Sequence, residues 1–147
     1  MTEVAFHFGA PDKLAYVCRL LRKAVNAGAK VLVLAPEADL PKLDVDLWAL
    51  SPAEFLPHRL ATEETAGEGS AQDRSPIVLA SHASQSATHR QVLVNLTDAV
   101  PDGFAEFARV IEVVGLDDAD RAQARARWKQ YTALGYTIVR HDLALKS

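Results

Sequence analysis

The sequence has few of the features that disulfide formation, export or membrane insertion require. It contains one cysteine, Cys18, so no internal disulfide can form, which fits a reducing cytoplasm. The N-terminal stretch MTEVAFHFGAPDK has no basic region followed by a long apolar run, so we expect no signal peptide. No uninterrupted apolar run approaches the length that spans a membrane. These absences predict a cytoplasmic protein that makes no use of a membrane.

The motifs of common enzymes and metal proteins are also missing. The glycines form neither G-x-x-x-x-G-K-[ST] nor G-x-G-x-x-G, and the close pair Gly67 and Gly69 lies in a polar stretch, 62–75, that we expect to be an exposed loop. No serine stands in a G-x-S-x-G frame, and no two of the five histidines have the spacing of a zinc pair. The sequence therefore predicts no catalytic residue, no metal and no cofactor. We interpret Cys18 as a buried apolar residue of the first helix.

Neither sign of charge dominates the chain. Sixteen Lys and Arg residues face nineteen Asp and Glu residues, for a formal net charge of -3. This balance argues against a protein that nucleic acid covers over its whole surface. With 147 residues, 49% of them hydrophobic, the chain suits one globular domain over residues 1–147.

Apolar runs and amphipathic stretches alternate along the chain. We expect strands at residues 3–8, 30–35, 76–81, 90–97, 110–114 and 136–143, and helices at 11–28, 37–50 and 117–135, with a short helix before residue 110. Pro11 and Asp12 suit the start of the first helix, and Gly28 suits the position after its end. Asp117, Asp118 and Asp120 lie in the first turn of the last helix and offer it a cap. Strands that alternate with helices predict an α/β fold with a mainly parallel, doubly wound sheet.

One segment, RAQARARWKQ at residues 121–130, holds four cations and no acid. On a helix with about 100° per residue, Arg121 and Arg125 fall in a narrow sector, with Trp128 on one side of it and Lys129 on the other. A solvated charged face is the commoner meaning of such a stripe. The alternative is a shallow site for an acidic ligand that also carries an apolar group.

A second segment, LWALSPAEFLPHRL at residues 47–60, holds bulky apolar residues on both sides of Ser51-Pro52, where a helix should stop. Trp48 and Phe55 can belong to the core or to an interface with a partner, because large aromatic residues favour both. The prolines around the segment favour at least one of them being exposed.

Together these segments resemble the chi subunit of bacterial DNA polymerase III holoenzyme, an accessory protein of its clamp loader. The resemblance rests on LDVDLWALSPAEFLPHRLA, on VLVNLTDAVPDGFAEFARVIEVV, and on the pattern R-x-x-x-R-x-R-W-K-x-Y-x-x-x-G-Y from Arg121 to Tyr136. It implies a Rossmann-like, three-layer fold that lacks a phosphate-binding loop, and a non-catalytic adaptor in DNA replication. It also implies two partners, the psi subunit and the acidic C-terminal tail of single-stranded DNA-binding protein, and hence an indirect association with single-stranded DNA.

Two groups of residues take their expected roles from this resemblance. Arg121, Arg125, Trp128 and Lys129 match the family's site for the tail, where relatives commonly have a tyrosine at the Trp128 position and a lysine at the Arg121 position. Trp48, Phe55 and Pro57 match the region that the family uses for psi. A direct single-stranded DNA-binding module is the alternative function, since it too needs cations and an aromatic residue for stacking.

Overall fold

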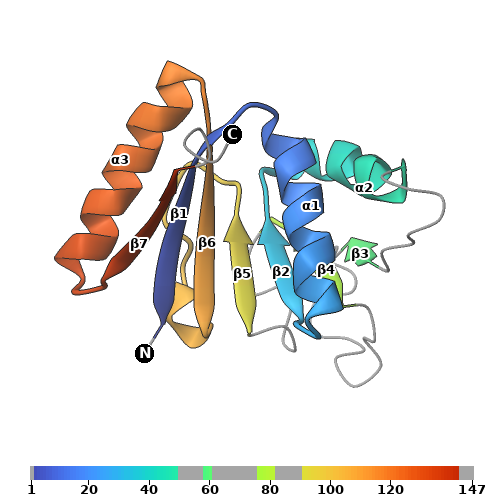
Figure 1. Cartoon of the computed structure of the whole chain (residues 1–147), viewed down its shortest axis with the longest axis horizontal. Coiled ribbons are helices and arrows are strands. Elements are labelled where there is room, and N and C mark those ends of the chain that lie inside the picture. The colour runs from blue at the N-terminus through green and yellow to red at the C-terminus, as the bar shows by residue number, and fades with distance from the viewer. Residues whose placement is uncertain (1, 50–57, 61–75, 82–90, 143–147) are drawn as a thin grey trace.

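A single parallel sheet organises the chain. The structure is a computed structural model that describes residues 2–49, 58–60, 76–81 and 91–142. Seven strands lie in the order β3-β4-β2-β5-β6-β1-β7, and each neighbouring pair is parallel (Figure 1). The strands are β1 (Glu3–Ala10), β2 (Val31–Leu34), β3 (His58–Leu60), β4 (Ile77–Ala80), β5 (Val92–Asn95), β6 (Arg109–Gly115) and β7 (Ile138–Asp142). The predicted Rossmann-like α/β fold is confirmed.

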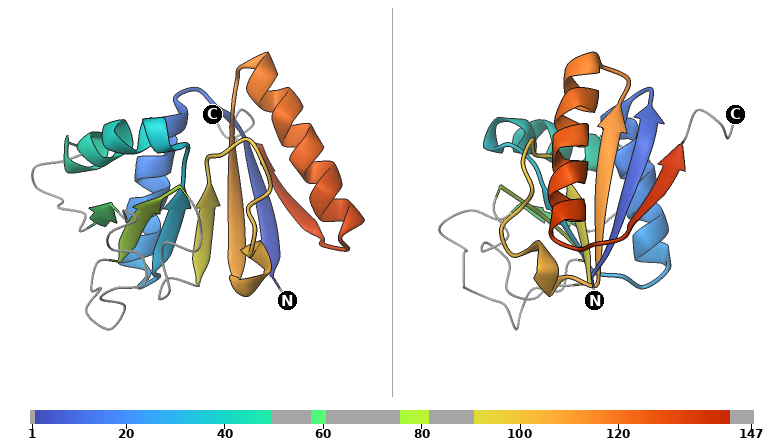
Figure 2. Two further views of the ribbon diagram at one scale, coloured as in Figure 1. Left: turned by 180° about the vertical axis from the view of Figure 1, so that it is seen from behind. Right: turned by 90° about the vertical axis from the view of Figure 1, so that its left-hand side faces the viewer.

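Helices cover both faces of this sheet. They are α1 (Lys13–Asn26), α2 (Leu40–Ala49) and α3 (Asp118–Ala133), with short 3-10 turns η1 (Glu37–Asp39) and η3 (Phe104–Glu106). In β2, Val31 and Val33 belong to the core under α1 and α2, whereas Leu32 and Leu34 belong to the core on the α3 side. Figure 2 shows α1 and α3 on opposite sides of the strands. Burial on both faces explains why the β2 run is apolar at every position.

The helix ends follow the signals in the sequence. Asp12 caps α1 by accepting a hydrogen bond from the Ala15 amide at 3.1 Å, and Asp117 caps α3 by accepting one from the Asp120 amide at 3.2 Å. Gly28 has a φ of 84°, a left-handed conformation that glycine adopts at little cost after a helix. The predicted burial of Cys18 is also confirmed.

Two local predictions differ from the structure. The edge strand β3 was not expected, and the short helix before residue 110 is only the 3-10 turn η3, which follows Gly103 at a φ of 79°. Strand β3 has three residues and a single apolar side chain, so its pairing with β4 is a tertiary effect that no local pattern shows.

The loop expected at 62–75 lies outside the described residues. Within the part of the chain that the structure describes, no helix combines the length and apolar character needed to cross a membrane.

Two apolar residues of α2 offer a test of this packing. Leu43 is fully buried in the core under α1 and α2, whereas Val45 is 62% exposed. We expect Leu43→Ala to lower the free energy of unfolding by about 2–5 kcal/mol, because it leaves a cavity. The matched change Val45→Ala should stay within about 0.5 kcal/mol. Urea denaturation would measure both, and equal losses would contradict the placement of α2.

Candidate binding surface on the last helix

Helix α3 has one buried face and one cationic face. Ala124, Arg127 and Tyr131 are buried against the sheet. Arg121, Arg125 and Lys129 are exposed on the other side, and Trp128 is half-buried at the boundary. The four residues expected to hold an acidic ligand therefore lie together along one side of a single helix, with an aromatic ring at its inner margin.

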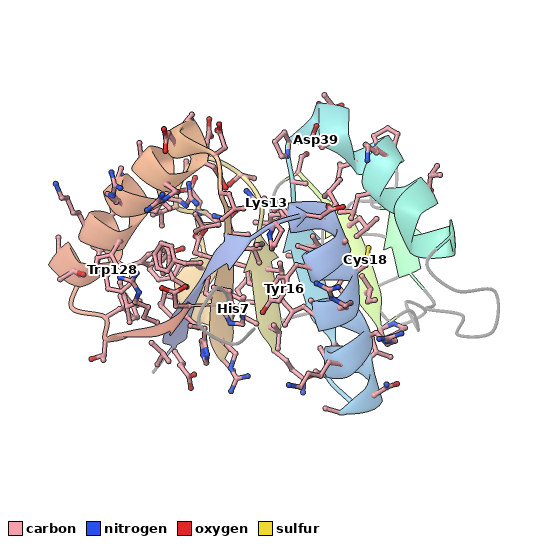
Figure 3. The ribbon with its side chains drawn as sticks, turned by 45° about the horizontal axis from the view of Figure 1, so that its top comes forward. His7, Lys13, Tyr16, Cys18, Asp39 and Trp128 are labelled. Atoms are coloured by element: carbon pink, nitrogen blue, oxygen red, sulfur yellow. The ribbon has the colours of Figure 1, made fainter. Side chains whose placement is uncertain are left out.

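Trp128 packs against strand β1. Its ring lies 5.1 Å from that of Phe6 and 6.0 Å from that of Phe8, measured between centroids. Figure 3 shows Trp128 at the end of the sheet formed by α3, β1 and β7. Phe6 is fully buried and Phe8 is half-buried, so the indole is held on its inner side and partly accessible on its outer side. A ring held in this way can offer apolar surface to a ligand with little loss of side-chain entropy.

Arg127 does not belong to the cationic face, although the sequence groups it with the three exposed cations. Its side chain is 2% exposed, and its Nε donates a hydrogen bond at 2.9 Å to a Glu112 carboxylate that is fully buried. The signal that could have found this pair lies elsewhere in the chain. Glu112 is the one charged residue inside the apolar run VIEVV of β6, and a carboxylate buried there requires a cation.

Two further donors complete the Glu112 cluster, which we define as Glu112, Arg127, Asn95 and Tyr131. The Asn95 side-chain amide donates to Glu112 at 2.8 Å, and the Tyr131 hydroxyl donates at 2.7 Å. The cluster thus joins β5, β6 and two turns of α3. Burial raises the pKa of Glu112 above its ordinary value, while the Arg127 charge and the three hydrogen bonds oppose the rise. Burial and the Glu112 charge raise the pKa of Tyr131, which keeps the hydroxyl a donor.

The first turn of α3 is fixed separately. Asp120 accepts a hydrogen bond from the Gly115 amide at 2.7 Å and forms an ion pair with Lys13 at 3.1 Å. These contacts tie the start of α3 to the end of β6 and to the start of α1. The Asp120 carboxylate therefore makes its contacts on the side of α3 away from the cationic face.

The carboxyl ends of the strands border an acidic hollow of about 440 Å³. In open α/β sheets this edge is where nucleotides commonly bind. Here Glu37 and Asp98 contribute carboxylates to the wall, Asp120 lies there in its ion pair with Lys13, and no Lys or Arg is among the described residues that line it. The carboxylates of Glu37 and Asp98 therefore disfavour phosphate groups at the described part of the wall.

The residues expected to contact psi are placed only in part. Trp48 lies in α2, and Phe55 and Pro57 lie outside the described residues. Helix α2 packs beside α1, β3 and β4, at the end of the sheet remote from α3 and β7 (Figure 1). The structure therefore brings the four residues of α3 together and keeps Trp48 apart from them.

Comparison with known proteins decides the family. The family described as "DNA polymerase III chi subunit, HolC" matches residues 1–139. The chain belongs to the DNA polymerase III chi subunit family. Two proteins named DNA polymerase III subunit chi are each 34% identical to it: that of Pseudomonas aeruginosa, over 97% of this chain and 98% of the relative, and that of Haemophilus influenzae, over 82% and 81%. The Escherichia coli protein of the same name is 28% identical over 83% of this chain and 80% of the relative.

A likeness to a solved structure concerns the fold alone. A chain from the complex of Saccharomyces cerevisiae Dbp5 with Nup159, Gle1, IP6 and ADP superposes with a TM-score of 0.63 at 10% identity, and the match covers 97% of this chain and 42% of that one. At this identity the likeness shows a shared fold and carries no ligand to this chain.

Arg127→Met tests the Glu112 cluster. The change leaves a buried carboxylate without its cation, so we expect the free energy of unfolding to fall by about 3–5 kcal/mol at neutral pH. Arg125→Met, two residues away on the exposed face, should change it by no more than about 0.5 kcal/mol. Urea denaturation measures both, and a small effect of Arg127→Met would show that the pair is dispensable.

The same variant has a predictable pH dependence. Without Arg127 the folded-state pKa of Glu112 rises further above its unfolded value of about 4.3. A raised carboxyl pKa contributes stability below the unfolded pKa, and this contribution is lost as pH rises through the folded pKa. The loss of unfolding free energy in Arg127→Met, relative to the unaltered protein, should therefore be smaller near pH 4 than near pH 7. Urea denaturation at both pH values would measure it. A loss that grows on acidification would contradict the view that the buried Glu112 carboxylate causes the instability.

Proposed function

We propose that this protein is a non-catalytic adaptor of DNA polymerase III in DNA replication. In this proposal the cationic face of α3 binds the acidic C-terminal tail of single-stranded DNA-binding protein, and the surface around Trp48, Phe55 and Pro57 binds the psi subunit of the clamp loader. Membership of the chi family supports the accessory role in replication. The chemistry of α3 supports the kind of ligand, an acidic peptide that ends in a hydrophobic residue.

The observation that carries the tail assignment is the unneutralised charge of α3. In the described part of the chain, no ion pair joins Arg121, Arg125 or Lys129 to an acid, whereas the buried Arg127 is fully paired. Exposed cations attract carboxylates over a range of about 8–10 Å at ordinary salt. Trp128 adds apolar surface for the hydrophobic end of such a peptide.

The position of α2 supports a second, separate surface. Helices α2 and α3 lie at opposite ends of the sheet, so a partner on one end need not touch a partner on the other (Figure 1). Helix α2 also carries an exposed apolar side chain, Val45, at 62% exposure. Val45 lies three residues before Trp48 on the same helix, at the end of the sheet where the proposal places psi.

The tail assignment is tested by single substitutions on α3. We expect Arg125→Ala and Lys129→Ala each to weaken binding of the tail peptide by about 1–3 kcal/mol, the range for hydrogen bonds to charged groups. Arg19→Ala, which removes an exposed arginine from α1, is the matched control and should leave the affinity unchanged. Calorimetric titration would measure the affinities, and added salt should weaken binding.

The same titration separates this function from its rivals. Single-stranded DNA and ATP are titrated in place of the peptide. Binding of the tail peptide, with no binding of single-stranded DNA or ATP, supports the adaptor. Uptake of single-stranded DNA without tail binding would instead support a direct DNA-binding module.

The two-surface arrangement predicts that psi and the tail bind at the same time. Phe55→Ala should abolish association with psi and leave both tail binding and the melting temperature nearly intact. If Phe55 belongs to the core, the change should instead cost about 3–5 kcal/mol and lower the melting temperature strongly. Pull-down of psi with and without saturating tail peptide, together with a thermal melt, distinguishes these outcomes. Competition between the two partners would contradict the adaptor model.

A further inference from the structure

We infer that the peptide surface does not end at α3 but continues across the edge strand β7, with Arg140 as a further cation and Phe8 as a second apolar wall beside Trp128. This inference rests on the proposed function, because it assigns two more residues to the same site. The ligand is the same class of peptide, acidic and ending in a hydrophobic residue.

Strand register places Arg140 on the α3 side of the sheet. Strand β7 is parallel to β1, with Arg140 opposite Phe6 and Asp142 opposite Phe8. Phe6 packs against Trp128 and Tyr131 of α3. Residues opposite one another on neighbouring strands share a face of the sheet, so Arg140 emerges on the same side as α3.

Direct contacts link Arg140 to the indole of α3. The Arg140 guanidinium carbon lies 4.7 Å from the centre of the Phe8 ring, and the Phe8 ring lies 6.0 Å from the Trp128 ring. Arg140, Phe8 and Trp128 thus form a continuous row from the edge strand to the helix. The Arg140 side chain is nevertheless 61% exposed, so its charge is available at the surface.

This geometry suits carboxylate binding. A guanidinium that rests on an aromatic ring keeps the N–H groups at its rim, where they can donate to a carboxylate in the plane of the group. Phe8 and Trp128 are both half-buried, so an apolar side chain of a ligand can contact their outer parts. A peptide seated here would meet cations on two sides, from α3 and from β7, with aromatic surface between them.

The carboxylate of Asp142 competes with a peptide carboxylate for Arg140. Its Oδ2 lies 3.6 Å from Arg140 Nη2, a long contact between partly exposed groups. An exposed pair of this kind is weak, and a peptide carboxylate can replace it. The carboxylate of Asp142 also repels an acidic peptide. Removing Arg140 and removing Asp142 should therefore change the affinity in opposite directions.

The test is calorimetric titration of the unaltered protein and of substituted chains with the acidic tail peptide. Arg140→Gln should weaken binding roughly threefold to tenfold, through the loss of a charged hydrogen-bond donor. Asp142→Asn should strengthen binding roughly twofold to threefold, by removing a nearby like charge. The matched control Arg109→Gln removes another exposed arginine, at the first residue of β6 and paired with Glu3 at 3.8 Å, and should leave the affinity unchanged.

The outcomes separate this inference from the function on which it rests. If Arg125→Ala and Lys129→Ala weaken binding while Arg140→Gln and Asp142→Asn have no effect, the site ends at α3 and the inference is overturned, though the proposed function stands. If the unaltered protein does not bind the peptide, both are overturned. A gain of affinity in Asp142→Asn supports the inference even if Arg140→Gln lowers the melting temperature, because partial unfolding cannot strengthen binding.

Discussion

The position of α3 depends on one buried ion pair, that between Arg127 and Glu112. An unpaired charge at this depth would cost several kcal/mol, so the helix must keep Arg127 turned inward. Arg125 and Lys129 each lie two residues from Arg127, about 200° around the helix, so the same rotation turns both of them outward. The buried pair thus orients the exposed cations. Asn95 and Tyr131 also donate hydrogen bonds to Glu112, which restricts the position of the carboxylate that Arg127 must reach.

Acidic and cationic side chains lie on different parts of this fold near the two candidate surfaces. The carboxyl edge of the sheet, where related folds bind nucleotides, carries Glu37 and Asp98, while Arg121, Arg125 and Lys129 are exposed along α3. An acidic edge and a cationic helix on one small chain favour opposite classes of ligand. A peptide that is acidic but short can use the helix without approaching the edge, whereas a long nucleic acid would meet both.

Much of this arrangement is readable from the sequence, because it depends on local chemistry. The apolar run at Val31–Leu34, the cap at Asp12 and the turn at Gly28 each act within a few residues, and the structure has all three. Arg127 and β3 depend instead on distant partners, Glu112 and β4. Helical spacing separates Arg127 from Arg121, Arg125 and Lys129, but it does not show that an arginine is buried. The search for a partner of Glu112, the charged residue in an apolar strand, is what singles out a cation for the core.

A parallel sheet buried on both faces is well suited to hold two partners apart. Its interior strands are hydrogen-bonded to both neighbours and packed by apolar side chains above and below, so α2 and α3 rest on one continuous sheet. In the proposed adaptor, a partner on α2 and a partner on α3 are therefore joined through this sheet rather than through a linker. The aromatic contacts of Trp128 with Phe6 and Phe8 join the cationic surface to the same sheet, since the indole at its margin is packed on β1.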